Sequence, residues 1–154
     1  MPHLTYCNVA WGNTYSSHVH KLQVLQKRAL RLITNSPYRS PSIPLFLQLH
    51  CLPFNELVSL NALIFMYKLH VSTSPSLFSD LSVKNSDVHS HNTRQKNLLH
   101  QPRVATNIAL KSFYMFCIKE WNLLPSNIKS STTFSRFKAM SHKYLFQRLT
   151  QSDG

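Results

Sequence analysis

Apolar residues recur at three- and four-residue spacings in several stretches, the pattern of one face of an α-helix. The first helix is predicted over about residues 17–35, because Ser16 or Ser17 can cap its start and Asn35-Ser36-Pro37 can stop it. Its apolar face carries Leu22, Leu25, Ala29, Leu32 and Ile33. The opposite face carries Lys27, Arg28 and Arg31, with His20 and Lys21 beside them. We therefore expect an amphipathic helix whose leucine side packs into the protein.

Helices are also predicted over about residues 54–70, 108–123 and 133–149, with a short one over 44–49. The 54–70 segment is apolar nearly all round, which indicates a helix that is central in the fold or packed against a lost partner. In the last helix we expect a mostly apolar stripe that consists of Phe134, Phe137, Ser141, Tyr144 and Leu145. The cations of this helix are expected to lie mostly outside the stripe: Arg136, Lys138, Lys143 and Arg148. Trp121 and Leu124 are expected to pin the end of the helix predicted over 108–123 to the core, with Asn122 bonding locally.

The stretch 71–107 lacks such periodicity and is rich in Ser, His, Asn and Thr. It predicts a flexible polar linker, partly disordered, between an N-terminal helical part (1–70) and a C-terminal helical hairpin (108–154). The chain has two glycines, too few for the turns of a typical β-rich fold. The fold class predicted is therefore all-α or mostly α, a small helical bundle.

The charge balance points to the partner. Seventeen Lys and Arg face five acids, for a net charge of +12. Such an excess favours nucleic acid and, less strongly, an anionic membrane surface, whereas the plain alternative is a basic, well-solvated chain. No apolar run reaches the length of a membrane span. With no signal-peptide pattern and three widely spaced cysteines that predict free thiols, we expect an intracellular protein, nuclear or cytoplasmic.

Two groups of cations are candidates for phosphate contact. On the first helix they are Lys21, Lys27, Arg28 and Arg31, which can lie along a sugar-phosphate backbone. In the linker they are Arg94 and Lys96, which stand among amide and hydroxyl donors suited to phosphate and 2′-OH contact. The alternatives are a solvated helix face and an ordinary polar linker.

Catalytic chemistry is not indicated. Template-directed polymerisation needs clustered carboxylates that hold Mg²⁺, yet no two acids here are closer than seven positions. No nucleophile-elbow motif is present either. The histidines at 18, 20, 89, 91 and 100 lack the cysteine or acidic company usual at zinc sites. We therefore predict no enzyme activity, no metal site and no cofactor.

Short sequence words along the chain resemble one family, the carboxyl-terminal region of non-LTR (LINE-type) retrotransposon reverse transcriptases, especially the chicken-repeat and jockey-like branches. The words are Tyr6-Cys7-Asn8, Trp11-Gly12, Leu25-Gln26-Lys27-Arg28-Ala29-Leu30-Arg31, Pro44-Leu45-Phe46, Phe65-Met66-Tyr67-Lys68, His91-Asn92-Thr93-Arg94, Trp121-Asn122-x-Leu124-Pro125 and Phe137-Lys138. Each word alone is weak, but their number, order and spacing over residues 4–149 make the resemblance fairly specific.

The resemblance implies a thumb-like helical bundle and tail without the catalytic palm. It implies binding of RNA, or an RNA/DNA hybrid, through a basic helical surface, and association with an upstream polymerase domain. Two alternatives stay open. The first is that the chain is a remnant retroelement reading frame with no selected function, and the second is that it is a basic helical module for protein interaction or membrane-surface binding.

Overall fold

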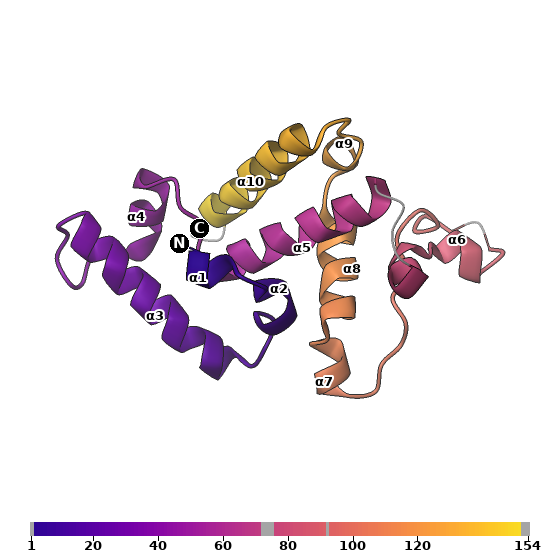
Figure 1. Cartoon of the computed structure of the whole chain (residues 1–154), viewed down its shortest axis with the longest axis horizontal. Helices are drawn as coiled ribbons and strands as arrows, with labels where there is room; N and C mark the ends of the chain where they lie inside the picture. The colour runs from indigo at the N-terminus through magenta and orange to yellow at the C-terminus, as the bar shows by residue number, and fades with distance from the viewer. Residues whose placement is uncertain (1, 72–75, 92, 152–154) are drawn as a thin grey trace.

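A computed structural model describes residues 2–71, 76–91 and 93–151. Within these ranges the regular elements are helices, and extended residues pair only at an isolated bridge between Lys84 and Leu99. The elements in chain order are α1 (Pro2–Thr5), α2 (Asn8–Trp11), α3 (Ser16–Ile33), α4 (Ser42–Gln48), α5 (Phe54–Val71), the 3₁₀ helix η1 (Ser76–Ser82), α6 (Asn85–Val88), α7 (Asn107–Leu110), α8 (Phe113–Leu123), α9 (Ser126–Lys129) and α10 (Phe134–Gln151). The predicted all-α bundle is confirmed (Figure 1).

Helix α5 is the centre of the bundle. It packs against α8 and α10, and its first turns also meet α1, α2 and α3 (Figure 1). Nine of its residues are buried, among them Phe54, Ala62 and Met66. Its all-round apolar character thus reflects neighbours on several sides within this chain. The alternative, a packing partner lost from the chain, is not needed to explain it.

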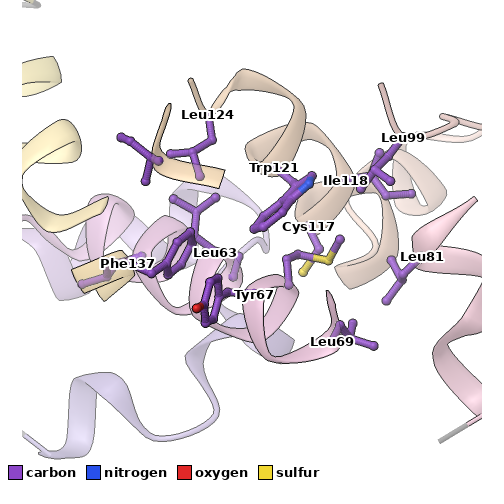
Figure 2. Packing of buried hydrophobic residues seen from close by; sticks show 14 of the residues in the cluster. Leu63, Tyr67, Leu69, Leu81, Leu99, Cys117, Ile118, Trp121, Leu124 and Phe137 are labelled. Atoms are coloured by element: carbon purple, nitrogen blue, oxygen red, sulfur yellow. The ribbon is translucent and has the colours of Figure 1, made fainter. Parts of the chain in front are cut away.

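Three aromatic rings join α5, α8 and α10 in the main core (Figure 2). Phe137 is fully buried and stacks on Tyr67, with 4.2 Å between ring centroids. Trp121 lies 6.0 Å from the same phenylalanine. Trp121 and Leu124 are both buried, which confirms that they pin the end of α8 to the core.

Two of the short sequence words fix α1 and α2 on α5. Asn8 is buried, donates to the carbonyl of Leu4, and accepts a 2.8 Å hydrogen bond from Asn61 of α5. A Cβ at Gly12 would overlap the carbonyl oxygen of Asn8 and a methyl group of Val58. Only glycine therefore lets α2 approach α5 this closely.

The end of α3 follows the sequence prediction. Asn35 takes up a left-handed backbone conformation with φ of 48°, which asparagine tolerates well. The next amide, that of Ser36, donates to the carbonyl of Arg31. This closing turn satisfies a carbonyl that the end of the helix leaves without a partner, and Pro37 follows it.

The buried face of α3 differs from the prediction. Val19, Gln26 and Leu30 are buried, whereas Leu25, Leu32 and Ile33 are exposed, Leu32 to 82%. The true stripe also has helical spacing, but a polar residue interrupts it. The side-chain amide of Gln26 donates to the carbonyl of Leu52 and accepts from the amide of Phe54, which ties α3 to the start of α5. The expected packing of Leu25 and Leu32 is therefore wrong.

Two leucines of α3 should consequently respond in opposite ways to truncation. Leu30→Ala is expected to lower the free energy of unfolding by about 2–3 kcal/mol, since its cluster with Leu45 and Phe46 is small enough to relax. Leu32→Ala, the matched control, should change it by less than about 0.5 kcal/mol. Chemical denaturation of both variants measures the difference. A large loss of unfolding free energy in Leu32→Ala, with none in Leu30→Ala, would show that α3 buries the face predicted from sequence.

The stretch expected to be a linker contributes to the core. Leu81 and Leu99 are buried in the main cluster. The stretch also contains two short helices, η1 and α6. The Asn122 side chain binds both the amide and the carbonyl of Leu99 at 2.9 Å, rather than bonding locally as expected. A long-range polar clamp thus holds this stretch, whose expected flexibility stays a prediction. Residues 72–75 and 92 lie outside the described ranges.

The C-terminal region also differs in detail. The predicted helix 108–123 is divided into α7 and α8, because the Ser112 hydroxyl accepts from the amide of Met115 and caps a new start. Both α8 and α10 pack on α5, and the division of the chain into two helical parts joined by a linker stays a prediction. On α10, Phe137, Ser141 and Leu145 are buried as the stripe predicts.

Candidate nucleic-acid interface

Three of the four cations predicted on the first helix line one depression. Lys27, Arg28 and Arg31 line a shallow cavity of about 230 Å³ together with Val24 and Tyr38. Arg28 is exposed, while Lys27 and Arg31 are partly buried. Successive turns of α3 supply the cations, and the loop after the helix supplies the tyrosine. Clustered positive charge with an aromatic ring beside it is the combination that binds nucleic acid strands.

Arg31 is held in place and so differs from a freely solvated cation. Its Nε and one Nη donate to the carbonyl of Ser40, at 3.1 and 3.0 Å. Its guanidinium carbon lies 5.9 Å from the centroid of the Tyr38 ring. The arginine therefore joins α3 to the loop 34–41 while its positive charge stays at the rim of the depression.

Tyr38 is the site residue that the sequence reasoning missed. Its side chain is 75% exposed, although it stands next to three cations. A signal was present in the sequence: an aromatic residue beside Arg39, in a short loop bounded by Pro37 and Pro41. Prolines restrict the backbone of such a loop.

The other predicted cations lie elsewhere. Lys21 is exposed on α3 and lines a larger cleft rather than the depression. Arg94 and Lys96 are exposed on the segment that follows α6, and the amide of Ser86 in α6 donates to the carbonyl of Lys96. Helices α6 and α3 lie at opposite ends of the molecule (Figure 1). The structure thus brings together Lys27, Arg28 and Arg31, but it does not bring Arg94 and Lys96 to them.

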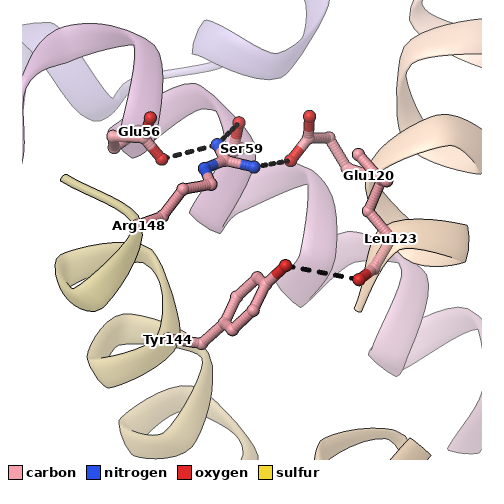
Figure 3. Close-up of polar contacts among 6 residues, drawn as sticks. All are labelled: Glu56, Ser59, Glu120, Leu123, Tyr144 and Arg148. Carbon is pink, nitrogen blue, oxygen red and sulfur yellow. Dashed lines mark hydrogen bonds and ion pairs between the residues drawn. The ribbon is translucent and has the colours of Figure 1, made fainter. Parts of the chain in front are cut away.

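A cleft of about 900 Å³ opens between α3, α5, α8 and α10. Its wall holds Glu56, Glu120 and Arg148 (Figure 3). One Nη of Arg148 lies 2.6 Å from Glu56, and the other lies 3.4 Å from Glu120. Arg148 was expected outside the apolar stripe of α10, yet it lies toward the core beside these carboxylates.

Burial and ion pairing shift three pKa values in and beside this cluster. Burial raises the pKa of Glu56, because desolvation outweighs the opposing attraction of Arg148. Burial alone would lower the pKa of Arg148, but the attraction of the two carboxylates is larger in sum, so the pKa is raised. Burial, and then the nearby Glu120, raise the pKa of the Cys117 thiol to about 12. Cys117 therefore stays protonated at neutral pH, and none of the three cysteines is paired.

Three carboxylates make ion pairs or hydrogen bonds within the fold. Glu56 and Glu120 share a guanidinium, and Asp87 accepts from the amide of Lys84 and the hydroxyl of Ser86. Asp80 is exposed on η1, far along the chain from Glu56. Asp153 lies outside the described ranges. Glu56 and Glu120 thus serve as salt-bridge partners, and Asp87 caps the start of α6.

Histidines gather at one further cavity, of about 740 Å³, lined by His89, His91 and His100. The rings of His89 and His100 meet edge to face at 6.1 Å, and His100 is bonded to Asn85. Across the residues that the structure describes, no three His, Cys, Asp or Glu side chains form a group suited to a metal ion. Nor does any helix among them have the length and apolarity needed to cross a membrane.

Comparison with known proteins finds no match to this chain among family models, curated proteins or solved structures. The interpretation of the site therefore depends on its own residues.

Proposed function

We propose that this chain is the carboxyl-terminal, non-catalytic portion of a non-LTR retrotransposon reverse transcriptase, and that it binds RNA or an RNA/DNA hybrid. The resemblance in its sequence words supports the family origin. The observation that carries the binding role is the gathering of Lys27, Arg28 and Arg31 around an exposed tyrosine. In this proposal the protein acts inside the cell, in the nucleus or cytoplasm, beside a polymerase domain.

Several residues of the short sequence words hold helices together. They are therefore not the residues that we propose to contact nucleic acid. Asn8, Gln26 and Asn122 hold elements together through buried or partly buried hydrogen bonds. Lys27 and Arg28, from the same word as Gln26, make no such contact in the described ranges. Their cations are therefore available to phosphates, while the other side of the helix anchors it to α5. The exposed Leu25, Leu32 and Ile33 support the alternative of a protein-interaction module, which stays a prediction.

The salt dependence of RNA binding tests the proposal. If about four to six phosphates are neutralised, log affinity should fall with log salt at a slope of about −3 to −5. Lys27→Gln/Arg28→Gln should weaken binding roughly tenfold and reduce the slope by up to about two, one for each lost contact. Fluorescence anisotropy with labelled RNA over a salt series measures both quantities. Affinity that is independent of salt would contradict phosphate contact.

Arg31 is left unchanged in this double variant for a structural reason. Arg31→Gln would also remove both hydrogen bonds to Ser40 and release the loop that carries Tyr38. The surface changes at Lys27 and Arg28 should each cost within about 0.5 kcal/mol of stability. An unchanged melting temperature then assigns any loss of affinity to the missing charges.

A further inference from the structure

We propose that the depression beside Tyr38 holds one unpaired base of a single-stranded nucleic acid, with the flanking phosphates on Lys27 and Arg28. This inference rests on the proposed function and names the form of nucleic acid that the site selects. The juxtaposition that supports it is an exposed aromatic ring, an aliphatic side chain and three cations around one small cavity.

The size and lining of the cavity fit a planar, partly apolar ring. At about 230 Å³ it is smaller than the roughly 300–1,000 Å³ of sites that take whole drug-sized ligands. Val24 and the Tyr38 ring supply apolar surface, while the three cations stand around them. A base is apolar on its faces, and its phosphates are anionic. One nucleotide therefore satisfies both kinds of surface.

The loop that carries Tyr38 is held by its own hydrogen bonds. The Thr34 and Ser36 hydroxyl groups lie 2.8 Å apart, and the amide of Ser40 donates to the carbonyl of Pro37. The guanidinium of Arg31 binds Ser40 from α3. The ring is thus presented before any ligand arrives, which lowers the entropic cost of binding. Arg31 acts here as a positioning residue for Tyr38.

The exposure of the ring separates single strands from duplexes. In a duplex the bases are stacked inside and present only their edges, so their faces cannot reach a side chain on the surface of a protein. In a single strand each base has a free face, and stacking on an aromatic side chain tolerates any sequence. The site should therefore prefer unpaired RNA or DNA and show little sequence preference.

The test compares a labelled ten-nucleotide RNA, its DNA equivalent, and the RNA as a duplex, for the full chain and its variants. Tyr38→Leu should weaken binding of both single strands about five- to a hundredfold, as loss of base stacking does elsewhere, and leave duplex affinity within about twofold. Tyr38→Phe keeps the ring and should retain the single-strand affinity. Tyr6→Leu is the matched control, because Tyr6 is 78% exposed and lines none of the three cavities described here.

The outcomes separate this inference from the function on which it rests. If Lys27→Gln/Arg28→Gln weakens binding but Tyr38→Leu does not, or if Tyr38→Leu weakens duplex binding equally, the base site is wrong and the phosphate site stands. If the native chain binds no nucleic acid, or the double variant binds as tightly as the native chain, the proposed function fails as well. A single-strand loss confined to Tyr38→Leu, with recovery in Tyr38→Phe, supports the base site.

Discussion

Replacing Phe137 by alanine is expected to lower the free energy of unfolding by about 3–5 kcal/mol. The phenylalanine is fully buried and stacks on Tyr67 at 4.2 Å, with Trp121 at 6.0 Å. Its removal opens a cavity where α5, α8 and α10 meet, and it also removes an aromatic pair that contributes beyond its buried area. Chemical denaturation followed by circular dichroism measures the loss.

Phe134 is the matched control for this prediction. It begins α10, one turn before Phe137, and its side chain is 40% exposed. Its contacts are a tilted approach to Tyr67 at 6.2 Å and the Lys68 ammonium at 5.4 Å. Phe134→Ala should therefore cost no more than about 1 kcal/mol. Equal losses at the two positions would show that α10 does not pack as described.

Arg148→Met is expected to cost about 3 kcal/mol at neutral pH. The substitution leaves Glu56 and Glu120 without their shared cation, and breaking such a pair commonly costs about 3–5 kcal/mol. The lower end applies because 31% of the Arg148 side chain is exposed and solvent screens part of the charge. Thermal unfolding at pH 7 measures this loss.

The loss at Arg148 should shrink as the solution is acidified. The pKa of Glu56 is already raised by burial, so the folded state holds this proton more tightly than the unfolded state does. That contribution to stability is complete below the unfolded pKa and is lost as pH rises through the folded pKa. Without Arg148 the pKa of Glu56 rises further, so the variant regains stability toward pH 4. A loss of the same size at both pH values would contradict this account.

Glu56→Gln provides the control for the charge cluster. Because burial outweighs the attraction of Arg148 at this carboxyl, its charge adds little net stability. Glutamine keeps an acceptor for Arg148, and Glu120 still neutralises the cation. This variant should change stability by less than about 1 kcal/mol at pH 7.

The long helices follow from sequence because their periodicity is local. The segment 54–70 is apolar on every side and lies at the centre of the bundle. The buried face of α3 could not be predicted in this way, since two apolar stripes run along it. The stripe with Gln26 is the buried one, and only the carbonyl of Leu52 and the amide of Phe54 make that burial favourable. Those groups are more than twenty-five positions away.

The remaining differences also depend on contacts distant in sequence. Leu99 belongs to the core because Asn122 binds its backbone, and no periodicity marks either residue. Arg148 meets Glu56 across 92 positions. For the candidate site, the cations were predictable from their spacing on one helix. The sequence offered Tyr38 only as an aromatic residue in a short loop, because its place beside the cations depends on the turn at Asn35 and on the anchor between Arg31 and Ser40.

The central claim, that RNA binds the basic face of α3, is tested most directly by relocating its charge. The variant Lys27→Gln/Arg28→Gln/Ser82→Lys/Ile108→Lys keeps the net charge of +12 but moves two cations to exposed positions on η1 and α7. Affinity for a labelled single-stranded RNA is then compared with that of the native chain at the same salt concentration. The account predicts binding at least about tenfold weaker, with a shallower salt slope. Equal affinity would show that any equally basic chain binds as well. It would favour the remnant alternative and contradict a site on this face.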